Sequence, residues 1–293
     1  MGIKQLGYLI FGTKDVPTWR TLAETVIGFT TTDGMNGALY LKMDERDYRI
    51  VIIPDSSERL IGSGWEVATK SAFDALRGAL EGDGVDVTEG TAAESRLRKV
   101  QSFFWFSDPA GNRAEVYWGF ISSFTPFRAP LTGPSAFNTA GIGLGHVVLP
   151  APDLELTQTF YYEKLGFELS DIINMKFGPA DVKVYFNHCH NRRQHSLALA
   201  GMPSPNGCVH FCVEVPTLKD VGMALDRVQA AGHPLVLTLG QHINDDCVSF
   251  YFLSPHGFMI EIGWDAVLKD WDNHSVFETT RPSHWGHQFV LNT

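Results

Sequence analysis

The sequence contains no histidine before position 146, whereas the rest of the chain contains eleven, from His146 to His287. Histidine is the side chain that changes protonation near neutral pH, and it is also the commonest metal ligand. We therefore expect metal or acid–base chemistry in the second half of the chain and a structural role for the first half.

Cysteine, positive charge and long apolar runs are scarce as well. The four cysteines show no spacing typical of a disulfide framework, which favours a reducing compartment. A formal net charge of −10 argues against binding to nucleic acid or to an anionic membrane. No apolar run reaches the roughly 18 residues of a membrane span, and the first residues show no signal-peptide pattern. We therefore expect a cytoplasmic protein whose partners include neither nucleic acid nor membrane.

The early part of each half repeats at an offset of 138 residues. Residues 6–9 (Leu-Gly-Tyr-Leu) then fall on residues 144–147 (Leu-Gly-His-Val). Gly28-Phe29, where a helix is expected to end, falls on Gly166-Phe167. Such matches indicate an internal duplication.

The later part of each half repeats at an offset of 146 residues. Residues 108–111 (Asp-Pro-Ala-Gly) fall on residues 254–257 (Ser-Pro-His-Gly), and Glu115 falls on Glu261. At this offset Ser71 falls on Thr217, and each precedes an Asp by three residues, which predicts N-caps of two amphipathic helices.

The repeat predicts an α+β fold of two tandem domains, each made of two βαβββ modules. The boundaries are residues 1–121 for a structural domain, 122–141 for a Pro-rich linker, 142–264 for a catalytic domain and 265–293 for a tail. In the first domain we expect helices over 16–27 and 72–80, and strands near 7–11, 38–43, 48–53, 64–68, 103–106 and 115–118.

Three polar positions distinguish the second half from the first. His146, His210 and Glu261 fall on Tyr8, Gly64 and Glu115 at the two offsets, so both imidazoles are absent from the first half. Two histidines and a carboxylate on separate strands are typical of the 2-His-1-carboxylate site of non-haem Fe(II) oxygenases. Satisfied polar residues of a core are the alternative, and so is a zinc site that uses the nearby Cys189, Cys208 and Cys212.

The change of offset predicts an insertion between Phe167 and about Leu197. We place it at residues 186–195, a segment rich in His and Arg, and we pair His195 with Arg49 of the first half. A loop of this kind is suited to acid–base groups, while His188 and His190 fit a solvated surface loop equally well.

One stretch of the second half resembles a family signature. It resembles the signature of the type I extradiol ring-cleavage dioxygenases of the vicinal oxygen chelate superfamily, whose domains are funnel-like barrels, and it departs from that signature at Ser254. Within the family the chain is similar to the two-domain 2,3-dihydroxybiphenyl and dihydroxynaphthalene dioxygenases. The matching residues are Gly240, His242, Phe250, Tyr251, Ser254, Pro255, Gly257 and Glu261.

The resemblance implies an iron-dependent enzyme. Its expected reaction is cleavage of an aryl-substituted or bicyclic catechol by O₂, giving a 2-hydroxy-6-oxo-dienoate, in an assembly expected to be an octamer. Fe(II) is preferred to Mn(II) on family frequency alone, since the ligands suit either. The implied metal ligands are His146, His210 and Glu261, and the implied catalytic residues are His195, His242 and Tyr251.

The substrate pocket is less defined by the sequence. Apolar residues on the predicted strands are candidates either for the pocket wall or for plain core: Val148, Met175, Phe186 and Ala200. Asn244 and Asp245 are expected to orient His242 or to contact the distal ring of the substrate. The competing functions are a non-catalytic ligand-binding protein of the same fold, and a lyase or isomerase that uses a divalent metal without O₂.

Overall fold

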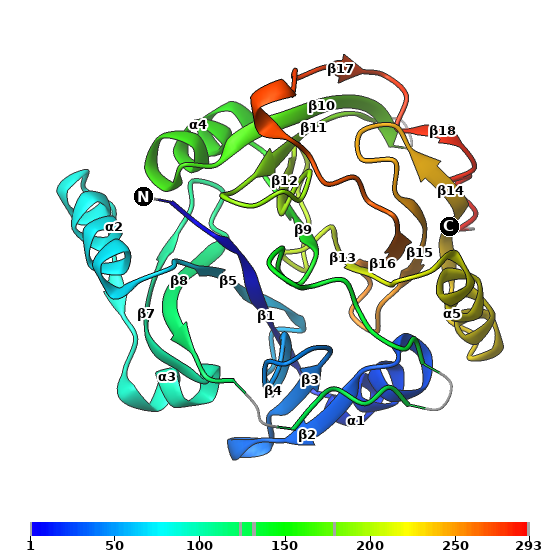
Figure 1. The fold of residues 1–293 in the computed structure, drawn as a ribbon, viewed down its shortest axis with the longest axis horizontal. Coiled ribbons are helices and arrows are strands. Elements are labelled where there is room, and N and C mark those ends of the chain that lie inside the picture. The colour runs from blue at the N-terminus through cyan, green and yellow to red at the C-terminus, as the bar shows by residue number, and fades with distance from the viewer. Residues whose placement is uncertain (1, 123–124, 131–132, 178–179, 292–293) are drawn as a thin grey trace.

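The computed structural model describes residues 2–122, 125–130, 133–177 and 180–291. Each half of the chain forms one curved mixed sheet, and the two sheets lie beside each other (Figure 1). Residues 5–120 are called the first unit below, and residues 146–264 the second unit. Part of the predicted linker lies outside the described residues.

The first sheet has the strand order β2-β3-β4-β1-β5-β8-β7-β6. Its central strands β1, β5 and β8 carry Tyr8, Gly64 and Glu115, the positions that the repeat paired with the predicted metal ligands of the second half. The elements are β1 (Gln5–Thr13), α1 (Val16–Thr21) with a π-helical continuation (Leu22–Ile27), β2 (Thr30–Asp33), β3 (Leu39–Lys42), β4 (Ile50–Pro54), β5 (Arg59–Glu66), α2 (Lys70–Gly82), β6 (Thr88–Glu89), α3 (Ala92–Arg98), β7 (Val100–Ser107) and β8 (Arg113–Phe120).

The second sheet has the order β17-β10-β11-β12-β9-β13-β16-β15-β14-β18. The tail therefore extends this sheet at both edges, which the sequence did not predict. The elements are β9 (His146–Pro150), α4 (Leu154–Leu165), β10 (Glu168–Phe177), β11 (Ala180–His188), β12 (Leu197–Ala200), β13 (His210–Glu214), α5 (Leu218–Ala230), β14 (Leu235–His242), β15 (Val248–Leu253), β16 (Met259–Trp264), β17 (Glu278–Thr279) and β18 (Ser283–Trp285).

The predicted α+β class is confirmed, but one predicted helix start is wrong. Helix α2 begins at Lys70, because the Thr69 hydroxyl accepts a hydrogen bond from the amide of Ala72. Thr217 caps α5 in the same way, so its counterpart is Thr69 and the expected N-cap Ser71 lies inside the helix. The offset at these helices is therefore 148, and the 146 measured farther along does not apply here.

The predicted place of the insertion is also wrong. The additional residues lengthen the hairpin of β10 and β11, which pairs Glu168 with His188, whereas the shorter β2–β3 hairpin pairs Thr30 with Lys42. The loop that leads to His195 is only one residue longer than its counterpart in the first unit. Two constant offsets bracket an insertion without locating it between them, and the His-rich composition of the loop was misleading.

Aromatic residues hold the two units together. Phe11 of β1 stacks on Phe258 with ring centroids 4.9 Å apart, and Trp65 of β5 meets Phe167 edge-on at 5.0 Å. All four side chains are at most 3% exposed and belong to one apolar cluster that includes residues of both sheets. Aromatic side chains of this size dominate the energetics of a core, so each unit contributes to the stability of the other. No helix of the described residues is long and apolar enough to cross a membrane.

Candidate metal centre and active site

Three neighbouring strands of the second sheet carry the predicted metal ligands. Cys212 of β13 pairs in register with His146 of β9 on one side and with Glu261 of β16 on the other. His210 lies two residues before Cys212, and alternate residues of a strand share a face. All three predicted ligands therefore point to the same side of the sheet.

The ligand atoms are spaced as a metal ion requires. His146 Nε2 lies 3.1 Å from His210 Nε2 and 3.1 Å from Glu261 Oε2, and His210 Nε2 lies 3.3 Å from the same oxygen. Ligands about 2.1 Å from a metal and at right angles to one another are about 3 Å apart. The three atoms thus match one face of an octahedron.

Burial and charge point to a cation at this place. Glu261 is 1% exposed, and neither of its carboxylate oxygens accepts a hydrogen bond. Burying a carboxylate without compensation is costly. Burial lowers the pKa of His146 to about 4, so its imidazole is neutral at pH 7, as a metal ligand must be. The donor set therefore fits a divalent metal ion.

The three cysteines of the alternative zinc site do not come together. The Cys212 thiol lies within 4.8 Å of the ligand atoms of His146 and Glu261, and burial raises its pKa well above the usual value. The Cys189 thiol donates to the carbonyl of Lys4. Among the described residues, no metal-capable group includes Cys189 or Cys208.

His195 lies directly beside the metal centre. Its ring centroid is 4.0 Å from that of His146, and the residue is 3% exposed. Its Nδ1 lies 2.6 Å from Oε1 of Gln194, so Nδ1 carries the proton that this oxygen accepts. Its Nε2 is buried and has no hydrogen-bond partner. Burial lowers the pKa of His195 well below the usual value, which leaves a neutral ring with a free lone pair.

A buried polar chain behind His195 was missed by the sequence. The Gln194 amide nitrogen donates to Asp171 at 2.5 Å, which turns its oxygen toward His195. Asp171 is fully buried, and its other oxygen accepts a hydrogen bond from the backbone amide of Phe277 in the tail. No sequence pattern links these three segments, because the contacts depend on the pairing of the strands.

His242 and Tyr251 form a second polar pair at the site. Tyr251 OH lies 2.7 Å from His242 Nε2, and His242 Nδ1 donates to the carbonyl of Pro282 at 3.1 Å. His242 Nε2 also lies 3.4 Å from Oε1 of Glu261. Burial raises the pKa of Tyr251 well above 10, so the phenol remains a proton donor. Pro282 belongs to the tail, which the sequence left without a role.

Comparisons with known proteins agree with this geometry. Residues 6–54 match the family model "Dihydroxybiphenyl dioxygenase BphC D1", and residues 143–262 match the "Glyoxalase/Bleomycin resistance protein/Dioxygenase superfamily". The chain is 40% identical to a biphenyl-2,3-diol 1,2-dioxygenase of Metapseudomonas furukawaii, over 99% of this chain and 95% of that protein. The chain belongs to the type I extradiol dioxygenases. This extradiol dioxygenase is also 36% identical to a 3-methylcatechol 2,3-dioxygenase of Pseudomonas putida, with 99% of each chain covered.

A solved structure shows the same architecture. The crystal structure of BphC, a halotolerant catechol dioxygenase, superimposes on the extradiol dioxygenase with a TM-score of 0.91 and 32% identity. The match covers 99% of this chain and 95% of that one.

The apolar residues expected at the substrate pocket of the dioxygenase lie together. Val148, Phe186 and Ala200 are buried in one cluster, and Met175 packs against it. The same cluster includes residues that the sequence did not single out: Ile173, Val182, Val184, Met202 and Val209. Asn244 and Asp245 are buried outside this cluster. Asp245 Oδ2 lies 3.9 Å from His195 Nδ1, so it is placed beside the histidine.

The counterpart of His210 in the first unit is Gly62, so the predicted pairing with Gly64 is wrong. Gly64 pairs with Tyr8 and Glu115, as Cys212 pairs with His146 and Glu261. The error has the same origin as the misplaced N-cap, since this strand also follows the offset of 148.

His195 corresponds to Tyr48, so the predicted pairing with Arg49 is also wrong. The backbone amide of Leu9 donates a hydrogen bond to the carbonyl of Arg49, and that of Val147 donates to the carbonyl of Ser196. Arg49 therefore matches Ser196, the residue after His195. The rings of Tyr8 and Tyr48, 5.8 Å apart, thus occupy the positions of His146 and His195.

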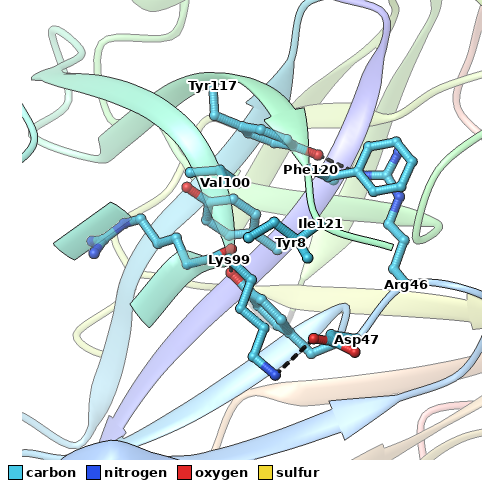
Figure 2. A pocket seen from close by; sticks show the side chains of 11 residues that line it. Tyr8, Arg46, Asp47, Lys99, Val100, Tyr117, Phe120 and Ile121 are labelled. Carbon is cyan, nitrogen blue, oxygen red and sulfur yellow. Dashed lines mark hydrogen bonds and ion pairs between the residues drawn. The ribbon is translucent and has the colours of Figure 1, made fainter. Parts of the chain in front are cut away.

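In the first unit of the dioxygenase, arginines bind the carboxylate that corresponds to Glu261. Arg98 donates to both oxygens of Glu115, with Nη2 2.6 Å from Oε1, while Arg113 and Tyr8 each donate one further hydrogen bond. Figure 2 shows the adjoining pocket, whose lining residues include two bonded pairs, Lys99 with Asp47 and Arg46 with Tyr117. Its volume is about 10 Å³, which is enough for about one water molecule.

Proposed function

We propose that the protein cleaves an aryl-substituted or bicyclic catechol, such as 2,3-dihydroxybiphenyl, with O₂ to a 2-hydroxy-6-oxo-dienoate. The proposal assigns Fe(II), rather than Mn(II), to His146, His210 and Glu261. The observation that carries it is the set of three buried ligand atoms beside the free Nε2 of His195. The names of the relatives support the reaction class.

The metal ion would supply a point at which a catechol and O₂ meet and through which electrons pass between them. His195 Nε2 accepts a proton from a catechol hydroxyl, since its lone pair is free and its ring is neutral. Tyr251 donates its single hydroxyl proton to a catechol oxygen, and His242 holds the phenol by donating from a protonated Nε2, a charge state that the raised pKa of His242 beside Glu261 favours. Val148 and Ala200 exclude water on the side where the second ring of the substrate is expected.

Domain roles follow from the same observations. We infer that residues 142–264 form the catalytic domain and residues 1–121 the structural domain, because Glu115 of the first unit is occupied by Arg98. The substrate-binding residues of this proposal are Val148, Met175, Phe186, Ala200, Asn244 and Asp245, and Asp245 also lies beside His195. Assembly as an octamer stays a prediction.

The test is anaerobic loading with Fe(II), followed by addition of a catechol in air. We expect oxygen uptake and a yellow ring-fission product, with 2,3-dihydroxybiphenyl giving a higher kcat/KM than 1,2-dihydroxynaphthalene or catechol. An iron-loaded, folded protein that consumes no O₂ with any of the three would refute the reaction. It would then favour the binding-protein or lyase alternatives. Loading with Mn(II) should restore less activity.

The ligand set has its own test. Glu261→Ala should lose stoichiometric iron, measured by metal analysis after gel filtration, because a neutral side chain leaves only two ligands. The matched control is Cys212→Ser, which changes the neighbouring group with little change of volume and should retain iron. Loss of iron in Cys212→Ser would instead assign the metal to a His/Cys/Glu set.

A further inference from the structure

The first unit contains a second cavity, of about 290 Å³. Strand β8 has Phe120 at the end near the pocket of Figure 2 and Arg113 at the other end, where this cavity opens. Arg59 and Trp105 line it as well, and Gly207 of the second unit lies at its rim. The first sheet therefore has a nearly filled pocket at one end of β8 and a larger cavity at the other end.

The cavity occupies a place equivalent to part of the active site. Trp105 pairs in register with Glu115 as Tyr251 pairs with Glu261, so Trp105 is the counterpart of Tyr251. Gly62, which also lines the cavity, is the counterpart of His210. The first unit thus keeps a hollow at this place and lines it with different chemistry.

The walls of the cavity carry an excess of positive charge. Arg113 lines the cavity and shares the buried carboxylate of Glu115 with Arg98, while Glu94, outside the lining, attracts both guanidinium groups. Arg59 adds a further guanidinium, and no ion pair joins it to any described residue. The cavity lining contains no Asp or Glu. An anion is therefore attracted here even though the whole chain carries a net charge of −10.

The cavity lining also contains the indole of Trp105, with the Arg113 guanidinium stacked over its ring. The guanidinium carbon of Arg113 lies 4.0 Å from the centroid of the Trp105 ring, and Arg113 uses only its Nε toward Glu115. Its terminal nitrogens are free for a carboxylate, which guanidinium groups bind through paired hydrogen bonds. The volume lies near the lower end of ligand pockets, which begin at about 300 Å³, so a ligand with one ring suits it.

We propose that this cavity binds a planar organic monocarboxylate, aromatic or conjugated. The carboxylate contacts Arg59 and Arg113, and the ring lies against Trp105. The site is separate from the metal centre, so its test does not depend on turnover or on bound iron.

The experiment is isothermal titration calorimetry of the full chain with benzoate and with benzamide, its neutral analogue of similar shape. Benzoate should bind at one site with a dissociation constant of about 1 mM or below. Benzamide should bind at least about tenfold more weakly, since a charge-assisted hydrogen bond contributes about 1.5–3 kcal/mol. Equal binding of the two ligands would refute the proposal.

Two variants and a competitor locate the site. Arg59→Ala should weaken benzoate binding by at least about fivefold, while Arg96→Ala, which removes an exposed arginine outside the cavity, should leave it unchanged. Trp105→Leu is the second variant and should weaken binding of benzoate by a similar factor. Saturating catechol under anaerobic conditions should leave benzoate binding intact. Displacement by catechol, or normal binding by both cavity variants, would place benzoate elsewhere and overturn the assignment.

Discussion

At the scale of single residues, the orientation of one amide decides which nitrogen of His195 is available. Asp171 binds the amide nitrogen of Gln194, so the amide oxygen faces His195 and fixes the proton on Nδ1. The unprotonated Nε2 is then the atom left for the substrate. A general base is effective only when the correct atom is held in place.

This arrangement predicts the effect of Gln194→Met, which removes the acceptor with a modest change of volume. We expect kcat to fall about tenfold, while KM for the catechol and the iron content stay unchanged, since the contribution of acid–base groups is typically 10²–10⁴-fold and is only partly lost here. Steady-state oxygen uptake and metal analysis measure these quantities. Gln229→Met, an exposed substitution on α5, is the control and should behave like the parent. A rise in KM with constant kcat would show that Gln194 acts on binding instead.

Removal of the base itself should be more severe. His195→Ala should retain iron and anaerobic catechol binding but lose about 10²–10⁴-fold in kcat. A variant that turned over like the parent would show that His195 has no role in proton transfer.

The site residues found from the sequence are recognisable by side-chain type, whereas those missed depend on tertiary contacts. His146 and His210 were found because the sister unit has no imidazole at the nearly matched positions, whereas Glu261 has the counterpart Glu115 and was found only in combination with the two histidines. Gln194 and Pro282 were missed, because an amide and a backbone carbonyl acquire their roles only through tertiary contacts.

At the scale of elements, both units use the same buried ion pair to hold the loop before the fourth strand. Arg46 pairs with Glu66 at 2.5 Å, and Arg193 pairs with Glu214 at 2.8 Å, with all four side chains at most 7% exposed. In the second unit this loop leads directly to His195. The ion pair is therefore a structural support for the active site.

Breaking the pair in the second unit should destabilise the fold. Arg193→Met leaves Glu214 buried and unpaired, and removal of one partner of such a pair costs about 3–5 kcal/mol of unfolding free energy. Urea denaturation measures it. Arg192→Met changes the exposed neighbour and should cost less than about 0.5 kcal/mol. Equal urea midpoints for Arg193→Met and Arg192→Met would show that the ion pair does not stabilise the loop.

Truncation of the tail should lower activity without unfolding the protein. A truncation from Thr280 to the end of the chain deletes β18 and the Pro282 carbonyl that holds His242. We expect kcat to fall at least about tenfold while the unfolding transition remains cooperative, because β18 lies at the edge of the sheet. A shorter truncation from Val290 keeps Pro282 and should retain activity. Full activity of the truncation from Thr280 would show that the tail does not position His242.

The sequence predicted most strands of the first unit near their observed places, but it missed β2, β6 and the helix α3 and placed β5 at 64–68 rather than at Arg59–Glu66. It misplaced the eight extra residues, which lie in the hairpin of β10 and β11 rather than in the loop before His195. Offsets measured on either side of an insertion fix its length, whereas its place depends on pairing partners that only the sheet reveals.

At the scale of the whole molecule, the two units share one interior. Phe11 contacts both Phe211 and Phe258 across the boundary between the units, and Trp19 donates to the ring of His256. The backbone of the loop before His195 is also bound to the segment that precedes β1, since the amide of His190 donates to the carbonyl of Ile3. The sequence predicted the duplication but gave no indication of these contacts, which require knowledge of the packing.

This shared interior predicts that the second unit does not fold alone. A fragment of residues 135–291 exposes Phe211 and Phe258 and should lack a cooperative thermal transition in near-ultraviolet circular dichroism. Coexpression with residues 2–122 should restore the transition. A cooperative transition in the fragment alone would show that the interface contributes little.

Because Arg98 neutralises Glu115 in the first unit, the two units respond differently to the loss of a metal ion. A guanidinium is covalently part of the chain, so it is never lost by dilution, chelation or oxidation, whereas a metal ion is exposed to all three. Loss of a metal ion from the second unit would therefore leave the buried carboxylate of the first unit with its arginine partner in place.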